Sequence, residues 1–196
     1  VVEVPNGTIT VVRPRLEVVS DPEATGEFEA EIGIYLDALI DRFRATDELN
    51  PGPVPNEFSV VPEVMLLHEY HLSIRFEEYW GVMAAAHPTS SVSGFMWDTP
   101  ATRLHPEDVL VPVDGPPALL ARVEAAVVAE LGDLMGVRIH LDDLVLTPDG
   151  IEVTIDEADG IPHVLGRVTA VFGWADLEGI VSVEKLWRIA GGELGP

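Results

Sequence analysis

The clearest hydrophobic pattern in the chain runs from Gly115 to Asp156 and predicts a helix that leads into a β-hairpin. Its first apolar residues recur at helical spacing, with charged residues turned to the other side: Leu119, Leu120, Val123, Val127, Leu131 and Leu134. Pro116 lies near the expected first turn and Gly136 follows the last periodic residue, which is typical of helix ends. We therefore predict one long helix over about 116–135.

Beyond Gly136 the period changes from helical to alternating. Apolar and polar residues alternate over 137–142 and again over 151–156. The intervening Pro148-Asp149-Gly150 is typical of a tight turn, because Pro presets its own backbone angle and Gly accepts a positive φ. The pattern predicts two paired strands whose polar residues, His140 among them, lie on a solvated face. On this interpretation the helix and hairpin form a scaffold that carries no functional site.

The segment from 27 to 44 fits two different periods. Its apolar residues have helical spacing: Phe28, Ile32, Tyr35, Leu36, Leu39, Ile40 and Phe43. The first part, 28–36, also alternates strictly between apolar and other residues, as a half-buried strand does. We predict a strand over 27–35, paired with a strand over 15–19, and then a shorter helix over about 36–46. One continuous helix is the alternative.

Shorter apolar runs predict the remaining strands: 8–12, 69–77, 109–113, 164–172 and 180–189. In the run over 69–77, alternation turns His71, Ser73 and Arg75 toward water or a partner. Segments rich in Pro and Gly predict loops instead: a rigid loop over 50–56, a long irregular region over 87–106 and a tail over 190–196.

Together these elements predict an α+β fold. We expect an antiparallel or mixed sheet of about seven or eight strands, with the two helices packed on it. The sequence contains no internal repeat and no linker, and 196 residues are enough to bury a substantial core. We therefore predict a single domain over 1–196.

The charge of the chain narrows the classes of partner. Its formal net charge is −23 at pH 7, whereas nucleic acids and anionic membranes are bound by cationic surfaces. We expect neither partner. Cysteine is absent, which excludes disulfides and thiolate ligands. No apolar run approaches the roughly 18 residues of a membrane span and nothing resembles a signal peptide, so we expect a cytoplasmic or virion location.

Two groups of residues could bind a metal ion, and for both we favour an interpretation without a metal site. His68 and His71 flank Glu69 and Tyr70, one residue short of the spacing in the HExxH metalloprotease motif, and on a strand they point to opposite faces. The acidic residues of 156–159, followed by Gly160, resemble half a calcium loop without its distal Glu, and we interpret them as a solvated turn. We therefore predict no catalytic residue, no metal and no cofactor.

The remaining functional signal is a set of large side chains in segments expected to be loops. These interface candidates are Trp80, Phe95, Met96, Trp97 and Trp174. Buried loop anchors are the alternative interpretation. We predict a structural or assembly subunit that binds other protein subunits as a homo-oligomer, for example a virion capsid, tail or connector-like component. The alternative is a small-molecule enzyme or binding protein with a pocket in the sheet that uses His68 or His71.

Overall fold

The computed structural model describes residues 1–15, 22–68, 71–82, 85, 87–98, 102–133 and 136–182. The strands are β1 (Val2–Val4), β2 (Gly7–Val11), β3 (Asn56–Leu67), β4 (His71–Gly81), β5 (Thr89–Asp98), β6 (Thr102–Leu104), β7 (Leu144–Thr147), β8 (Gly150–Ile155) and β9 (Val168–Gly173). The helices are α1 (Pro22–Leu49), α2 (Pro106–Val109) and α3 (Gly115–Leu131), with short 3-10 helices η1 (Glu157–Asp159), η2 (His163–Leu165) and η3 (Trp174–Leu177).

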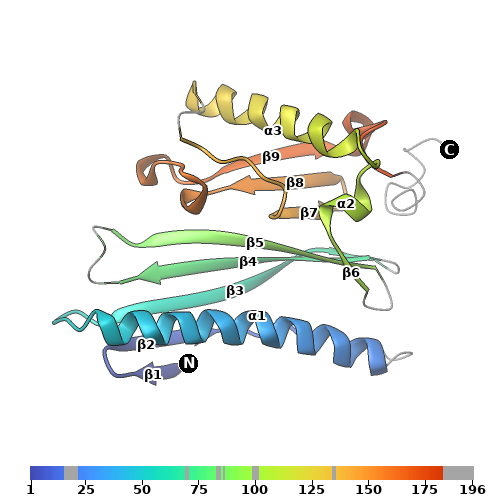
Figure 1. Ribbon diagram of the computed structural model, residues 1–196. Coiled ribbons are helices and arrows are strands. Elements are labelled where there is room, and N and C mark those ends of the chain that lie inside the picture. Colours follow the sequence, from blue (N-terminus) through green and yellow to red (C-terminus); the bar gives the residue numbers. More distant parts are fainter. Residues whose placement is uncertain are drawn as a thin grey trace. The chain divides into compact units, whose positions relative to one another are not determined.

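The predicted α+β class is confirmed (Figure 1). Within the described residues, nine strands form a six-stranded sheet in the order β1-β2-β3-β4-β5-β6 and a three-stranded sheet in the order β7-β8-β9. The larger sheet is mixed, because β1 runs antiparallel to β2 while β2 runs parallel to β3. The strands that we expected in one sheet are therefore divided between two. No helix in these ranges combines the length and the apolar character that a membrane crossing requires.

The chain divides into two compact units. Unit 1 comprises Val1–Glu63 and Phe76–Ser91, and unit 2 comprises Val64–Arg75 and Val92–Pro196. The boundaries fall within β3, β4 and β5, and therefore not at a linker. A single domain over 1–196 stays a prediction.

In unit 1, α1 is one continuous helix that packs on the sheet. The side chains at helical spacing are those that are buried: Phe28, Ile32, Leu36, Leu39 and Phe43. Ile34, which an alternating strand would bury, is 74% exposed. The strand predicted over 27–35 is therefore wrong, and the continuous helix is confirmed. The helical period prevails because it matches the single buried stripe of this segment.

Aromatic side chains fix α1 to the sheet in unit 1. The rings of Phe43 and Phe58 stack with centroids 5.4 Å apart. The centroid of the Trp80 ring lies 4.5 Å from that of Phe58. Arg42 lies over the Trp80 ring, with its guanidinium carbon 4.9 Å from the ring centroid. Such contacts add to the free energy gained from burying the rings.

A buried polar network joins three segments of unit 1. Asp47, near the C-terminal end of α1, is fully buried. Its Oδ2 accepts a hydrogen bond of 3.0 Å from the Asn6 backbone N–H, and its Oδ1 accepts one of 2.9 Å from Asn56 Nδ2. Asn6 Nδ2 in turn donates to the Asp47 carbonyl at 3.0 Å. The network ties α1 to the turn between β1 and β2 and to the start of β3.

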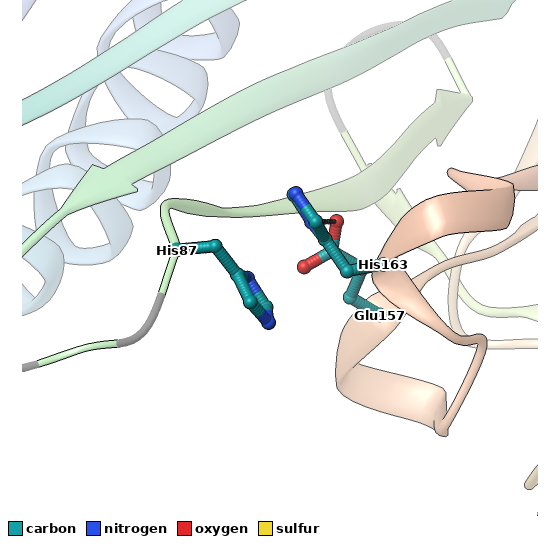
Figure 2. Close-up of side chains that lie close together, drawn as sticks. All are labelled: His87, Glu157 and His163. Atoms are coloured by element: carbon teal, nitrogen blue, oxygen red, sulfur yellow. Dashed lines mark hydrogen bonds and ion pairs between the residues drawn. The ribbon is translucent and has the colours of Figure 1, made fainter.

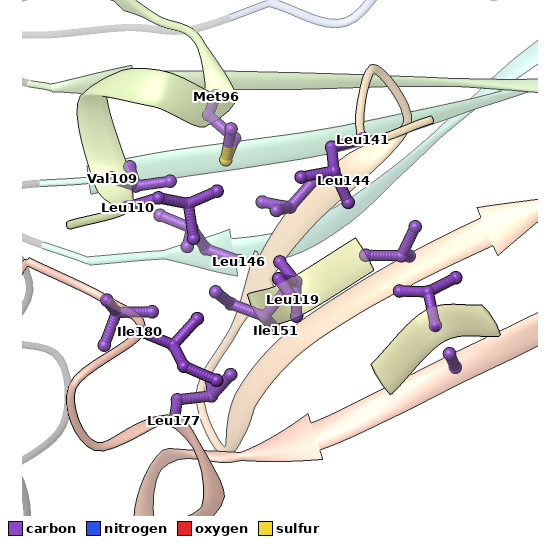
Figure 3. Packing of buried hydrophobic residues seen from close by; sticks show 14 of the residues in the cluster. Met96, Val109, Leu110, Leu119, Leu141, Leu144, Leu146, Ile151, Leu177 and Ile180 are labelled. Atoms are coloured by element: carbon purple, nitrogen blue, oxygen red, sulfur yellow. The ribbon is translucent and has the colours of Figure 1, made fainter. Parts of the chain in front are cut away.

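In unit 2, α3 covers one face of the three-stranded sheet, and its side chains contribute to one apolar cluster (Figures 1 and 3). The predicted long helix is confirmed, but it ends at Leu131 rather than near 135. Gly132, and not Gly136, ends it with the left-handed backbone (φ 79°) that favours glycine. With 17 residues α3 is shorter than α1, which has 28, so the predicted order of the two helix lengths is reversed.

The predicted hairpin is correct at its turn and wrong in its first strand. β7 and β8 pair antiparallel from Leu144 opposite Val153 to Thr147 opposite Gly150, with Pro148 and Asp149 in the turn. Residues 137–141 lie before β7 and belong to no strand. Their apolar side chains pack against the cluster of unit 2, so their alternation reflects packing without a ladder of hydrogen bonds.

Several other predictions are corrected in the same way. The region 87–106, expected to be irregular, contains β5 and β6, and the strand expected over 109–113 is replaced by the end of α2 and an isolated bridge. β3 was not predicted at all. The strands expected over 8–12, 69–77 and 164–172 correspond to β2, β4 and β9 with shifted ends. The predicted strand 15–19, most of 180–189 and the tail 190–196 fall largely or wholly outside the described residues.

Candidate cation site

Three side chains that can bind a metal ion converge in unit 2. His140, Asp143 and Asp159 each offer one ligand atom, and these atoms all lie within 4.8 Å of one another. Asp143 directly precedes β7, and Asp159 ends η1, which follows β8. Antiparallel pairing of β7 with β8 brings the start of one strand beside the end of the other, so both carboxylates lie at the open end of the hairpin.

Local hydrogen bonds orient the Asp159 carboxylate, and one backbone hydrogen bond joins η1 to the loop before β7. The Asp156 N–H donates to Asp159 Oδ2 at 3.1 Å, and the Asp159 N–H donates back to the Asp156 carbonyl at 3.1 Å. The Arg138 N–H donates to the Asp159 carbonyl at 2.7 Å. This last bond places His140, two residues further on, beside the Asp159 carboxylate.

Two carboxylates of this region accept hydrogen bonds from β5. Since β6 pairs only with Met96–Asp98, the preceding part of β5 has backbone N–H groups that β6 does not cover. The Val92 N–H donates to Asp156 Oδ2 at 2.7 Å, and the Gly94 N–H donates to Asp143 Oδ1 at 3.3 Å. A Cβ on Gly94 would lie 2.8 Å from the Leu144 carbonyl oxygen, so the close approach requires glycine.

The imidazole of His140 is the only base among these acids in the described site. Its Nε2 lies 2.6 Å from Asp159 Oδ1. Its Nδ1 is buried, makes no hydrogen bond to the described residues and lies 3.6 Å from Asp142 Oδ2. Burial alone would lower the pKa of His140, but the hydrogen bond to Asp159 and the charges of the neighbouring carboxylates outweigh it and raise the pKa.

Burial raises the pKa of Asp143 to about 7. The positive charge of His140 and the hydrogen bond from Gly94 act in the opposite direction, while the charges of Asp156 and Asp159 add to the increase. Asp156 and Asp159 are only 4% and 6% exposed. The site therefore concentrates carboxylates in a poorly solvated place, where a cation relieves their repulsion.

A second histidine–carboxylate pair involves Glu157, the first residue of η1. His163 Nδ1 lies 2.6 Å from Glu157 Oε1 (Figure 2). The Glu157 side chain is 10% exposed, and its second oxygen makes no hydrogen bond to the described residues. One short 3-10 helix thus carries two carboxylates, each paired with a different imidazole.

The sequence contained part of this site, but its interpretation was wrong. The acidic pattern of 156–159 predicts a solvated turn, whereas Asp156 and Asp159 are both buried. His140 and Asp143 were expected on the solvated side of the hairpin, whereas both are half-buried. The available signal was the pair of Asp residues before Gly160, combined with a histidine near the other end of the hairpin.

The interface candidates have different environments. Met96, Trp97 and Trp174 are between 1% and 3% exposed, and Trp174 Nε1 donates to the Pro148 carbonyl at 2.9 Å. These side chains are buried within the chain. Trp80 and Phe95 are half-buried and are the members of the set with surface left for a partner; their interface role stays a prediction.

His68 and His71 do not form a common site. His71 is 2% exposed, and its Nδ1 lies 3.8 Å from Asp98 Oδ1. Two backbone hydrogen bonds join the two residues across the turn between β3 and β4. Neither side chain lines the surface grooves described below. A ligand pocket that uses these histidines stays a prediction.

No family model matches the sequence, and no curated protein matches it either. Among solved structures, the chain is similar to a DUF3298 family member from Bacteroides fragilis, with TM-score 0.58 and 19% identity over 89% of this chain and 74% of the other. It is also similar to a DUF3298 family protein from Pseudomonas aeruginosa, with TM-score 0.54 and 18% identity over 65% of this chain. The chain spans 62% of the length of that Pseudomonas protein. At this identity, the likeness shows a shared α+β fold.

Proposed function

We propose that this chain is a cation-binding protein whose site is formed by His140, Asp143 and Asp159. One observation carries the proposal: an imidazole and two carboxylates place ligand atoms within 4.8 Å of one another. Imidazole and carboxylate are among the ligands that proteins use for divalent metal ions.

The bonds around the three residues support a binding role over a purely structural one. Asp143 and Asp156 accept hydrogen bonds from the N–H groups of β5, so a structural role explains these two residues. It explains neither His140 nor Asp159. Backbone N–H groups orient one oxygen of Asp143 and one oxygen of Asp159. Such outer hydrogen bonds are typical of metal ligands, which need fixed orientations.

The metal-free protein is expected to bind a divalent cation with one-to-one stoichiometry. Asp159→Asn and His140→Ala should each weaken the affinity at least about 10-fold, because the first removes the negative charge of a ligand and the second removes a ligand. Isothermal titration calorimetry, with Zn²⁺ and Ca²⁺ titrated separately, measures the effect. Circular dichroism establishes that each variant is folded.

Asp149→Asn is the matched control, since Asp149 is exposed at the opposite end of the same hairpin. It removes one negative charge without removing a proposed ligand, and should leave the affinity within about 3-fold of wild type. Equal weakening by Asp149→Asn and Asp159→Asn would show a general attraction to an acidic chain and contradict the proposed site.

The assembly role is a second candidate, favoured by an open surface in unit 1. A groove of about 310 Å³ is lined by Val54, Pro55 and Tyr79 among others. A second groove of about 290 Å³ is lined by Thr8, Thr10 and Ser59 among others. Glu57 and Tyr79 line both grooves, and Tyr79 is 37% exposed. Partly exposed aromatic side chains beside grooves are common at the centres of protein interfaces.

Native mass spectrometry and sedimentation at micromolar concentration test the assembly proposal. An oligomer is expected in both low and high salt, and Tyr79→Ala should shift it toward monomer. Val171→Ala, at a side chain of unit 2 that is 63% exposed, should leave it unchanged. A monomer in both salt conditions would rule out self-assembly of this chain.

A further inference from the structure

We infer that the site at His140, Asp143 and Asp159 selects a transition-metal cation of the Zn²⁺ class over Ca²⁺ and Mg²⁺. This inference rests on the proposed function, because it names the class of cation that the proposed site binds. Three features carry it: the type of donor atoms, the number of oxygens left for a metal and the state of the imidazole.

The first feature is a nitrogen donor. Ca²⁺ and Mg²⁺ are bound almost entirely by oxygen atoms, whereas imidazole suits Zn²⁺ and its neighbours in the first transition row. A site that supplies one of its three side-chain donors from His140 gives a hard cation fewer suitable ligands. It gives Zn²⁺ the mixture of nitrogen and oxygen ligands found in many of its sites.

The second feature is the small number of available oxygens. Asp143 Oδ1 accepts a hydrogen bond from the Gly94 N–H, and Asp159 Oδ2 accepts one from the Asp156 N–H. Asp143 therefore keeps one oxygen that accepts no hydrogen bond from the described residues, whereas Asp159 Oδ1 faces His140 Nε2 at 2.6 Å and binds a metal only when that bond opens. These bonds favour monodentate ligation by each carboxylate. The nearby Asp156 is not among the three residues whose ligand atoms converge, and its Oδ2 accepts a hydrogen bond from the Val92 N–H.

These donors suffice for a four-coordinate metal completed by water, but not for Ca²⁺. Ca²⁺ takes about 6 to 8 oxygen ligands, often with bidentate carboxylates. Bidentate ligation by Asp143 or Asp159 would use an oxygen that already accepts a backbone hydrogen bond and would weaken that bond, which is costly for a poorly solvated N–H group. The protein itself thus disfavours the coordination that Ca²⁺ prefers.

The third feature is the environment of the His140 ring. Nε2 faces Asp159 Oδ1 at 2.6 Å, while the buried Nδ1 makes no hydrogen bond to the described residues. A ring held by a carboxylate through one nitrogen, with the other nitrogen able to bind a metal, is the usual arrangement of metal-binding histidines. The same bond can also open to let Asp159 bind the metal directly. Either geometry uses a nitrogen ligand, so the preference for Zn²⁺ holds in both.

Competition and spectroscopy of the metal-free protein test the inference. Zn²⁺ and Co²⁺ should bind at least about 100-fold more tightly than Ca²⁺ and Mg²⁺, and bound Co²⁺ should give the intense visible absorption of a tetrahedral site. His140→Asn replaces the nitrogen donor with an oxygen donor. It should lower the ratio of Zn²⁺ affinity to Ca²⁺ affinity at least about 10-fold.

The outcomes separate this inference from the proposed function. Ca²⁺ could bind as tightly as Zn²⁺ and be weakened by Asp143→Asn and Asp159→Asn. That result would overturn the inferred preference for Zn²⁺ and leave the proposed cation site intact. If none of the four cations binds, both proposals fail. Both also fail if Zn²⁺ binds with unchanged affinity to Asp143→Asn, Asp159→Asn and His140→Ala, since the ion is then held elsewhere. The Asp149→Asn variant again serves as the control for charge.

Discussion

Replacing Asp47 with alanine is expected to lower the free energy of unfolding by about 3 to 5 kcal/mol. The side chain is fully buried, and its two oxygens accept hydrogen bonds from the Asn6 N–H and from Asn56 Nδ2. Alanine would leave the half-buried Asn6 N–H without this acceptor, and the buried Asn56 Nδ2 would keep the Asn50 carbonyl but lose Asp47. Because the network ties the C-terminal end of α1 to β3, the loss should affect the whole of unit 1. Urea unfolding followed by circular dichroism measures it.

Asp41→Ala is the matched control on the same helix. Asp41 is 76% exposed and lies 3.3 Å from Arg44, so removing it should change the free energy of unfolding by no more than about 0.5 kcal/mol. Asp47→Asn should fall between the two, because the amide keeps one acceptor and turns a donor toward another donor. A cost for Asp47→Ala no greater than that for Asp41→Ala would contradict the assigned role of the network.

The metal-free protein is expected to lose about 2 to 4 kcal/mol of stability through Asp143 as the pH rises from about 4 to 7. Burial raises the pKa of this carboxyl from 3.8 to about 7. Between these values the folded protein holds a proton that the unfolded chain has released, so each increase in pH favours unfolding. The raised pKa of His140 acts in the same direction, because its stabilising positive charge is lost as the pH increases further.

The chain has 34 acidic residues. The Asp143→Asn variant isolates the contribution of Asp143 to the pH dependence of stability. The asparagine cannot titrate but keeps an oxygen for the Gly94 N–H. Urea unfolding of both proteins, with a chelator present at pH 4, 5, 6, 7 and 8, gives the difference in stability. Wild type should lose stability relative to the variant up to about pH 7 and then level off. A difference that stays constant across this range would disprove the raised pKa.

Elements with local signals could be predicted from the sequence. The buried stripe of α3 repeats every three to four residues, and the turn between β7 and β8 is encoded by adjacent residues. β3 had no such signal, because it contains Pro62 and because Val61, Val64 and Leu67 are all exposed. Its burial pattern does not alternate along its full length. The β5 segment is rich in Ser and Gly, which are typical of loops.

The candidate site depends on contacts that no local pattern encodes. Asp156 meets Val92 across 64 positions of the chain, and Asp143 meets Gly94 across 49. Taken alone, an Asp before or after a strand is typical of a solvated turn. Only the contacts between distant segments show that Asp156 is buried and Asp143 half-buried, and therefore that the pKa of Asp143 is raised.

The carboxylates that cover β5 also bear on how copies of this chain meet. An exposed strand edge with free N–H groups invites another strand to extend the sheet, and natural proteins block such edges. Asp156 and Asp143 occupy the N–H groups of Val92 and Gly94. A carboxylate accepts hydrogen bonds but presents no donor to continue a ladder. This part of β5 is therefore closed to strand addition.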